Sequence, residues 1–166
     1  PTLLPKLNNT KALATTVIHA AAGFHKGGII TRPPFREIHN SVSQAALFGG
    51  NQIPTPGEVS LAHNGILFMD ELSEFPRKYI QMLRTPIETK EIKISRLGYN
   101  YTFPCNFIFA AASNPCPCGF YGDDKKACYC TARKITNFYT KISGPILDRI
   151  DIILYINRPK KDMLFK

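Results

Sequence analysis

The sequence contains no phosphate-binding loop of the G-x-x-x-x-G-K-[ST] type, and none of its 11 glycines is followed by lysine. The glycine-rich stretch at 23–28 is no substitute, because it follows a predicted helix and lacks the lysine and hydroxyl that such a loop carries at its end. The 166 residues therefore hold no conventional backbone cradle for the β- and γ-phosphates of a nucleotide.

Long apolar runs are absent as well. No stretch approaches the roughly 18 apolar residues that a membrane-spanning helix needs. The first six residues, PTLLPK, have neither the charged nor the apolar region of a signal peptide. We therefore expect a cytoplasmic protein that does not associate with a membrane.

The charge is strongly unbalanced, with 21 Lys and Arg against 12 Asp and Glu and a formal net charge of +9. Such a surplus favours an anionic partner, either nucleic acid or the phosphates of a nucleotide. A long basic run, which would indicate direct DNA binding by this segment, is missing. The clustered basic residues come only in pairs, at 77–78, 125–126, 133–134 and 160–161.

Hydrophobic residues make up 44% of the chain and charged residues 20%, which is ordinary for one globular domain of this length. Apolar runs at 66–69, 107–112 and 151–156 predict three buried strands. Helical patterns at about 76–84 and 132–142 separate them. This alternation predicts an α/β fold, with a parallel sheet flanked by helices.

Three further elements are expected from local patterns. A helix begins after Asn9-Thr10 and stops near Gly23, with Leu13 and Val17 on one face. Alternation at 91–95 and 99–103 around Arg96-Leu97-Gly98 predicts a β-hairpin inserted before the second strand. The segment 26–57, rich in Gly and Pro, is predicted to be mostly loop, with a short helix at 43–48.

Two carboxylates, Asp70 and Glu71, close the first predicted strand. In an open parallel sheet the ligand lies beyond the carboxyl ends of the strands. At that place Asp70 can hold Mg²⁺ on a nucleotide, and Glu71 can polarise the water that attacks the γ-phosphate. The alternative is a solvated strand end before a turn.

Four cysteines form two C-x-C pairs separated by nine residues: Cys116, Cys118, Cys128 and Cys130. Four thiolates can complete the tetrahedral shell of a structural Zn²⁺ ion, although the usual zinc spacing is C-x₂₋₄-C. Free thiols and disulfides are the alternatives, the latter disfavoured in the cytoplasm. Cys105 stands apart at the end of the hairpin and is expected to be buried.

Three motifs occur in order along the chain: GEVSLAHNGILFMDELSEFPR at 57–77, FIFAAASNPCPCG at 107–119 and SGPILDRIDI at 143–152. Together they resemble the AAA+ ATPases of the magnesium-chelatase-like family, in the competence-associated, DNA-processing branch. The resemblance runs from about Pro1 to Asn157. It implies that Asp70 and Glu71 form the Walker B pair of a site for ATP and Mg²⁺.

The resemblance also gives roles to two further residues. It places Asn114 at the sensor 1 position, where an amide touches the γ-phosphate and the attacking water. From spacing alone, Asn114 bonding its own turn before Pro115 is the alternative. Arg149 matches an arginine finger that acts on the nucleotide of the next subunit, so the resemblance implies a homo-oligomer, expected to be a hexameric ring. An Arg149 ion pair with Asp148 or Asp151 is the alternative.

By the same resemblance, residues 1–166 form a single partial AAA+ core domain from Walker B to the arginine-finger region. The phosphate-binding loop would lie upstream and the lid downstream, so that the fragment alone would be nearly inactive. The parent would couple ATP hydrolysis to remodelling of a macromolecule, with DNA as the expected partner. The competing hypotheses are a magnesium chelatase motor subunit and a non-enzymatic, zinc-stabilised binding module.

Overall fold

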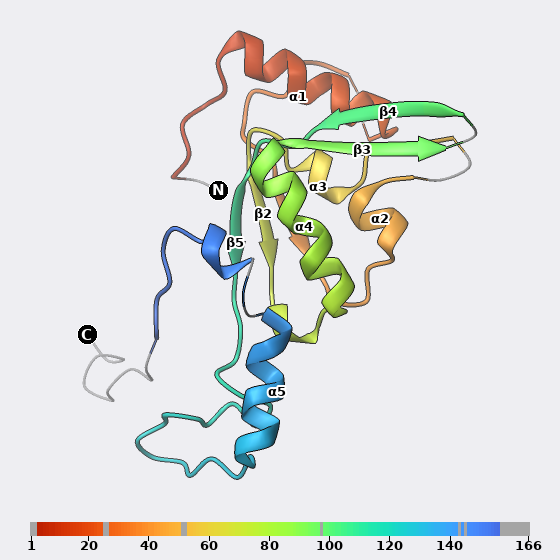
Figure 1. Ribbon diagram of the computed structural model, residues 1–166. Helices are drawn as coiled ribbons and strands as arrows, with labels where there is room; N and C mark the ends of the chain where they lie inside the picture. Colours follow the sequence, from red (N-terminus) through yellow and green to blue (C-terminus); the bar gives the residue numbers. More distant parts are fainter. Residues whose placement is uncertain are drawn as a thin grey trace.

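The computed structural model describes residues 3–24, 27–50, 53–96, 98–142, 144 and 146–156. Its centre is a three-stranded parallel sheet (Figure 1). Strand β2 (Ile66–Met69) lies between β1 (Phe35–Ile38) and β5 (Ile108–Ala111), and its last residue, Met69, is level with Ala111 of β5. The α/β fold predicted from the alternating elements is confirmed.

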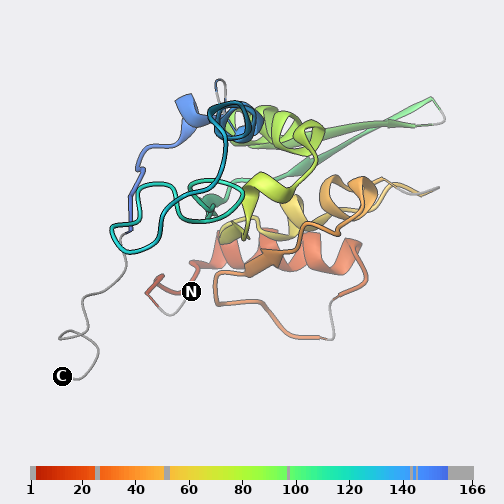
Figure 2. The same cartoon turned by 90° about the horizontal axis from the view of Figure 1, so that it is seen from below.

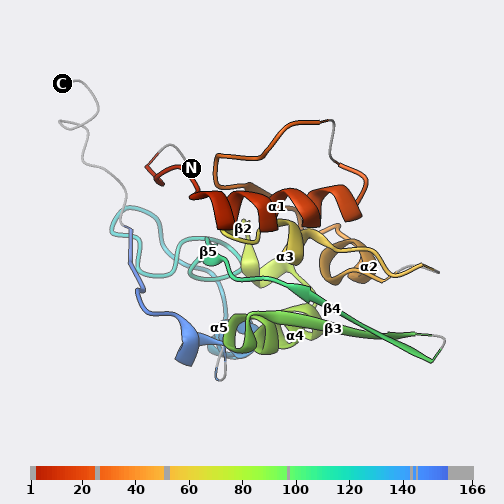
Figure 3. The ribbon, with the colours of Figure 1, turned by 90° about the horizontal axis from the view of Figure 1, so that it is seen from above.

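Helices cover the two sides of this sheet. Helix α1 (Asn9–Ala21) lies on one side, while α4 (Arg77–Thr89) and α5 (Ala132–Ile142) lie on the other (Figure 3). Strand β2 alternates between half-buried and fully buried residues, so its two faces are not equally covered. The buried face, Leu67 and Met69, shares one core with the buried residues of α4, Ile80 and Leu83.

The described chain also contains four short helical elements. Two α-helical segments, α2 (Gln44–Phe48) and α3 (Glu58–Leu61), come before β2. Two 3₁₀ turns, η1 (Leu72–Glu74) and η2 (Leu147–Arg149), follow β2 and α5 respectively. Among the described residues, no helix is both long and apolar enough to cross a membrane.

The predicted hairpin is present. Strands β3 (Glu91–Arg96) and β4 (Tyr99–Pro104) pair antiparallel and reach out sideways from the rest of the molecule (Figure 3). Leu97, in the predicted turn, lies outside the described residues. Cys105 follows the hairpin and is fully buried, as expected, and burial raises the pKa of its thiol to about 12.

The predicted third strand was placed in the wrong part of the chain. Residues 151–156 form no strand in the part of the chain that the structure describes, and Ile152, Leu154 and Ile156 are 74%, 76% and 90% exposed. An apolar run becomes a strand only where a neighbour offers free backbone groups, and none of the described strands pairs with it. The third strand is instead β1, inside the segment predicted to be loop.

Helix α1 has its N-terminus where expected, with the Asn8 side chain accepting a hydrogen bond from the Lys11 backbone. Its apolar face is turned differently, however. Leu13 and Val17 are 59% and 57% exposed, whereas the smaller side chains of Ala12 and Thr15 are buried. Close approach to α3 favours small residues over the larger apolar ones.

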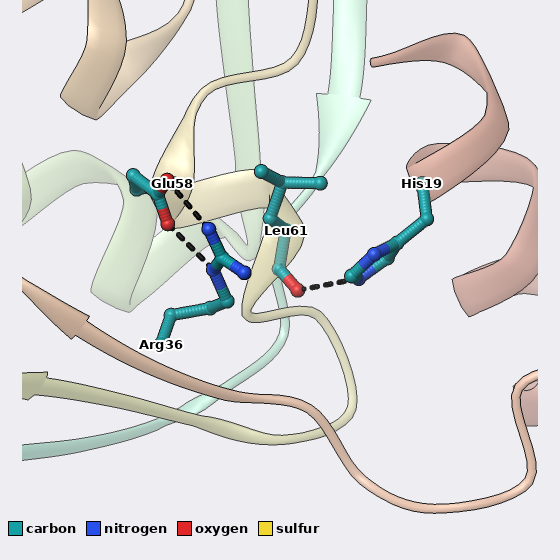
Figure 4. Close-up of polar contacts among 4 residues, drawn as sticks. All are labelled: His19, Arg36, Glu58 and Leu61. Atoms are coloured by element: carbon teal, nitrogen blue, oxygen red, sulfur yellow. Dashed lines mark hydrogen bonds and ion pairs between the residues drawn. The ribbon is translucent and has the colours of Figure 1, made fainter. Parts of the chain in front are cut away.

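Two polar contacts attach α3 to its neighbours (Figure 4). The Arg36 guanidinium of β1 donates two hydrogen bonds of 2.6 Å to the Glu58 carboxylate at the start of α3. At the other end of α3, the His19 ring of α1 lies 3.0 Å from the Leu61 carbonyl oxygen. A short helix with little intrinsic stability is thereby held between β1 and α1.

Gly65 lets β1 and β2 come together at their starting ends. A Cβ atom on Gly65 would lie 2.0 Å from the Pro34 carbonyl oxygen, which accepts a hydrogen bond from Ile66. No side chain fits that space, so glycine is required at the start of β2.

Candidate functional site

The carboxylate pair lies at the carboxyl end of the central strand. Asp70 and Glu71 follow β2 directly and both are exposed. Asp70 Oδ1 accepts a hydrogen bond of 2.9 Å from the Glu71 backbone. Glu71 has φ 51° and ψ 49°, a left-handed conformation that residues other than glycine adopt at some cost. The chain thus turns sharply at Glu71 and leaves both carboxylates in solvent.

A hydrogen bond joins this turn to the end of β5. The Leu72 N–H donates to the Ala112 carbonyl at 2.9 Å, and the Ala112 N–H donates to Met69 at 3.0 Å. The segment ending in Asn114 therefore runs beside the Asp70–Glu71 turn. These bonds bring Asp70, Glu71 and Asn114, which are predicted to contact Mg²⁺, the attacking water and the γ-phosphate, to one edge of the sheet.

Asn114 does not bond its own turn. Within the described part of the chain its side-chain amide makes no hydrogen bond, and it is exposed. The neighbouring Ser113 hydroxyl donates instead to the Asn114 backbone carbonyl at 3.2 Å. The amide is thus free to meet a ligand at the sheet edge.

Helix α5 packs on η1, the 3₁₀ turn after Glu71. The ammonium group of Lys141 in its last turn donates to the Ser73 carbonyl at 3.2 Å, and Phe138 and Ile142 are buried. Sequence reasoning missed this support. The spacing of Ile135, Phe138, Tyr139 and Ile142 predicts one buried face of α5. Phe138 and Ile142 are buried, whereas Tyr139 is 42% exposed. The spacing does not indicate which element that face contacts.

Arg149 is not at this edge. Its guanidinium forms an ion pair with Glu88, in the last turn of α4, rather than with Asp148 or Asp151. Helix α4 starts six residues after Glu71 and runs away from the carboxyl ends of the strands (Figure 1). The Arg149–Glu88 pair therefore lies at the opposite end of α4 from Asp70 and Glu71.

The four predicted metal ligands do come together. The Sγ atoms of Cys116, Cys118, Cys128 and Cys130 all lie within 4.8 Å of one another. Cys116 Sγ lies 3.3 Å from Cys118 Sγ and 3.7 Å from Cys128 Sγ. Cys118 Sγ and Cys128 Sγ are 3.5 Å apart. All four are free thiols.

The thiols of this cluster influence one another's protonation. Burial alone would raise the pKa of Cys118, but hydrogen bonds from the Phe120 backbone and from neighbouring thiols lower it to about 6. At Cys128 a backbone hydrogen bond from Cys130 acts to lower the pKa, but burial and the neighbouring thiols outweigh it and raise the pKa to about 12. The contacts within the cluster thus lower the pKa of Cys118 and raise that of Cys128.

Comparison with known proteins identifies the family. Residues 1–164 match the family model described as magnesium chelatase, subunit ChlI. YifB of Escherichia coli (strain K12), an uncharacterized protein, is 42% identical over 165 residues, covering 99% of this chain and 32% of YifB. An uncharacterized protein of Mycobacterium tuberculosis (strain H37Rv) is 42% identical over 161 residues, covering 95% of this chain and 32% of that protein.

A third relative carries a functional name. The competence protein ComM of Haemophilus influenzae is 40% identical over 159 residues, covering 93% of this chain and 30% of ComM. The chain thus spans about a third of the length of the curated relatives it matches. The match over nearly all of its residues, together with these relatives, establishes that the chain belongs to the magnesium chelatase ChlI family, in the branch that includes a competence protein.

Proposed function

We propose that this chain supplies the Mg²⁺- and water-handling half of an ATP hydrolysis site, as a single partial AAA+ core domain. The observation that carries the proposal is the Leu72–Ala112 hydrogen bond, which brings the Asp70–Glu71 turn beside the segment that ends in Asn114. The three exposed side chains then face a ligand at the carboxyl edge of a parallel sheet, where nucleotides bind in such folds.

Each of these residues has a role set by its chemistry. Asp70 holds Mg²⁺ through its water shell, because carboxylates are the preferred protein ligands of this hard cation. Glu71 accepts a proton from the attacking water, and Asn114 donates its amide N–H to the γ-phosphate. The left-handed turn at Glu71 supports this reading, since backbone strain concentrates at functional sites.

The other half of the site comes from elsewhere. The phosphate-binding loop is missing from these 166 residues, and Arg149 lies at the far end of α4. We infer that Arg149 acts on the nucleotide of an adjacent subunit, in a homo-oligomeric ring that is hexameric. A planar guanidinium placed there neutralises the charge that develops on the transferred phosphoryl group.

The whole protein, on this proposal, is a cytoplasmic ATPase that remodels DNA. The relative named as a competence protein supports DNA as the substrate, as does the net charge of +9. The family description favours a second candidate, a motor that drives Mg²⁺ insertion into a porphyrin. Stimulation of ATP hydrolysis by DNA in the full-length protein would support the first function, and stimulation by a porphyrin and its chelatase partners would support the second.

The test of the hydrolysis site is Glu71→Gln in the full-length protein. This change removes the proton acceptor but leaves Asp70, so ATP hydrolysis should be abolished while nucleotide binding is kept. The control is Glu74→Gln, three residues further on, exposed and outside the proposed site. Normal hydrolysis by Glu71→Gln, or equal losses in both variants, would contradict the proposal.

A further inference from the structure

We propose that Cys116, Cys118, Cys128 and Cys130 bind one Zn²⁺ ion through four thiolates. With a Zn–S distance of about 2.3 Å, the edge of a tetrahedral four-sulfur shell is about 3.8 Å. The Sγ–Sγ separations among Cys116, Cys118 and Cys128 are 3.3, 3.5 and 3.7 Å, and the Sγ atoms of all four cysteines lie within 4.8 Å of one another. Small shifts would bring these atoms to the tetrahedral distances.

Neither alternative accounts for this arrangement as well. A disulfide bond has an S–S length of about 2.05 Å, well below the 3.3 to 3.7 Å separations among Cys116, Cys118 and Cys128. Pairing any two thiols would also leave the other two beside the disulfide. Hydrogen bonds among four unligated thiols would stabilise the cluster only slightly, because S–H is a weak donor and sulfur a weak acceptor. Convergence from two C-x-C pairs therefore points to a common ligand.

The backbone around the cluster already supports the first pair of ligands. The Tyr121 N–H donates to Cys116 Sγ at 3.3 Å, and the Gly119 N–H donates to the Cys116 carbonyl at 2.9 Å. Hydrogen bonds to a ligand atom orient it and stabilise its charged form when a metal is bound. A turn that directs N–H groups at sulfur is suited to hold thiolates.

The segment from 116 to 130 also has few buried side chains to order it. Cys116 is its one buried residue, and Figure 2 shows the segment as an open loop that leads into α5. Its local contacts include a turn at Asp123, whose carboxylate accepts hydrogen bonds from the Lys125 and Lys126 backbones, and the Lys126 ammonium over the Phe120 ring. Such contacts offset little of the free energy that is lost when the conformational entropy of 15 residues is reduced. The bonds of a metal–thiolate shell offset much more of it.

The position of the cluster gives the ion a structural role beside the proposed nucleotide site. Cys116 comes two residues after Asn114, and Cys130 comes two residues before the start of α5. Helix α5 in turn contacts η1 through Lys141 and Ser73. A bound ion would hold the exit of β5 and the start of α5 together, so that it positions both Asn114 and the turn after Glu71.

The first experiment is elemental analysis of the protein purified without chelator. We expect about one zinc per chain, by the four-thiolate stoichiometry of structural sites. Replacement with Co²⁺ should give thiolate-to-cobalt charge-transfer bands and tetrahedral d–d bands. Cys118→Ser and Cys128→Ser should lose the metal, whereas Cys105→Ala, the matched change at the one cysteine outside the cluster, should keep it.

A second measurement uses the unmodified protein, so it does not require the cysteine variants to fold. Removing the metal from the unmodified protein with a chelator should increase hydrogen exchange in residues 116–130 and at the start of α5, and leave β2 protected. The proposal is overturned if the protein holds no zinc and all four thiols react freely in the native state, or if mass spectrometry finds disulfides among them. Retention of zinc by a variant lacking both Cys118 and Cys128 would also overturn it.

Discussion

The backbone N–H of Leu72 donates a 2.9 Å hydrogen bond to the Ala112 carbonyl, beyond the ends of the strands that precede them. This bond extends the contact between β2 and β5 past their last paired residues, Met69 and Ala111. Two turns that are 40 residues apart in the chain are thereby held side by side. Exposed polar side chains occupy both turns, as the proposed site requires.

The first prediction concerns nucleotide binding by the 166-residue chain alone. Because no phosphate-binding loop is present, only the Mg²⁺ and water side of the site remains, and ATP should bind weakly or not at all. Isothermal titration calorimetry with Mg-ATP should show no affinity in the micromolar range. Tight binding would reveal an unconventional phosphate site.

The second prediction concerns Arg149 in the full-length protein. If its guanidinium stabilises the transition state at the next subunit, Arg149→Ala should lower turnover by about 10³-fold or more. Mixing this variant with Glu71→Gln should restore part of the activity, because mixed rings contain some interfaces with both residues intact. Steady-state ATPase assays of co-assembled mixtures measure the recovery.

The ion pair with Glu88 supplies the control for Arg149. Glu88→Gln removes the negative charge that pairs with Arg149 within the same chain but leaves the arginine in place. Turnover should stay close to that of the unmodified protein. A loss as large as that of Arg149→Ala, or mixtures that co-assemble without recovery, would assign Arg149 to the ion pair and not to a shared site.

The third prediction concerns the bidentate Arg36–Glu58 pair, which is about three-quarters buried. Glu58→Gln should lower the free energy of unfolding by about 1–2 kcal/mol, because one charge-assisted pair of hydrogen bonds is lost. Urea denaturation measures the change, and Glu74→Gln serves as the exposed control. A double-mutant cycle with Arg36→Met should show positive coupling, whereas additive losses would mean that the two side chains act separately.

The fourth prediction concerns stability against pH. Burial, followed by the positive charge of Lys11, lowers the pKa of His63 from its ordinary value of 6.5, and His63 Nδ1 accepts a 3.1 Å hydrogen bond from the Asn106 backbone. The unfolded chain therefore takes up a proton near pH 6.5, before the folded chain does. The His63 contribution to stability should be constant above that pH and should be lost as the pH falls below it, towards the folded pKa.

Urea denaturation from about pH 7 to about pH 5 tests the His63 prediction, with His63→Gln as the variant. The free energy of unfolding of the unmodified protein should fall more steeply over this range than that of the variant. Equal slopes, or an NMR titration that places the His63 pKa above 6.5, would contradict it.

The patterns of the chain predicted most of the elements that carry the site. Strand β2, the hairpin and α5 all lie where the sequence predicts them, because an apolar run, strict alternation and helical spacing are each recognisable without a distant partner. Asp70 and Asn114 could likewise be placed at strand ends, and parallel strands in one sheet bring such ends together. The four cysteines were predicted as a possible metal cluster from their spacing alone.

Other features were decided by tertiary contacts. The run at 151–156 has the composition of a strand but pairs with none of the described strands, while the short Phe35–Ile38 segment becomes a strand because β2 offers it free backbone groups. Leu13 of α1 is exposed because the close approach of α1 to its neighbours favours smaller side chains. Arg149 pairs with Glu88, 61 residues away, a contact that no local pattern indicates.

The candidate metal site likewise combines features that local sequence shows with features that depend on tertiary contacts. The amino-acid order alone shows that four sulfur ligands are available in a segment with little apolar content. Only the folded chain brings their Sγ atoms within 4.8 Å, because the directions of β5 and α5 decide where the two C-x-C pairs meet. Residue types and their periodicity are local properties of a chain, whereas pairing partners and ligand convergence depend on packing between elements that are distant in sequence.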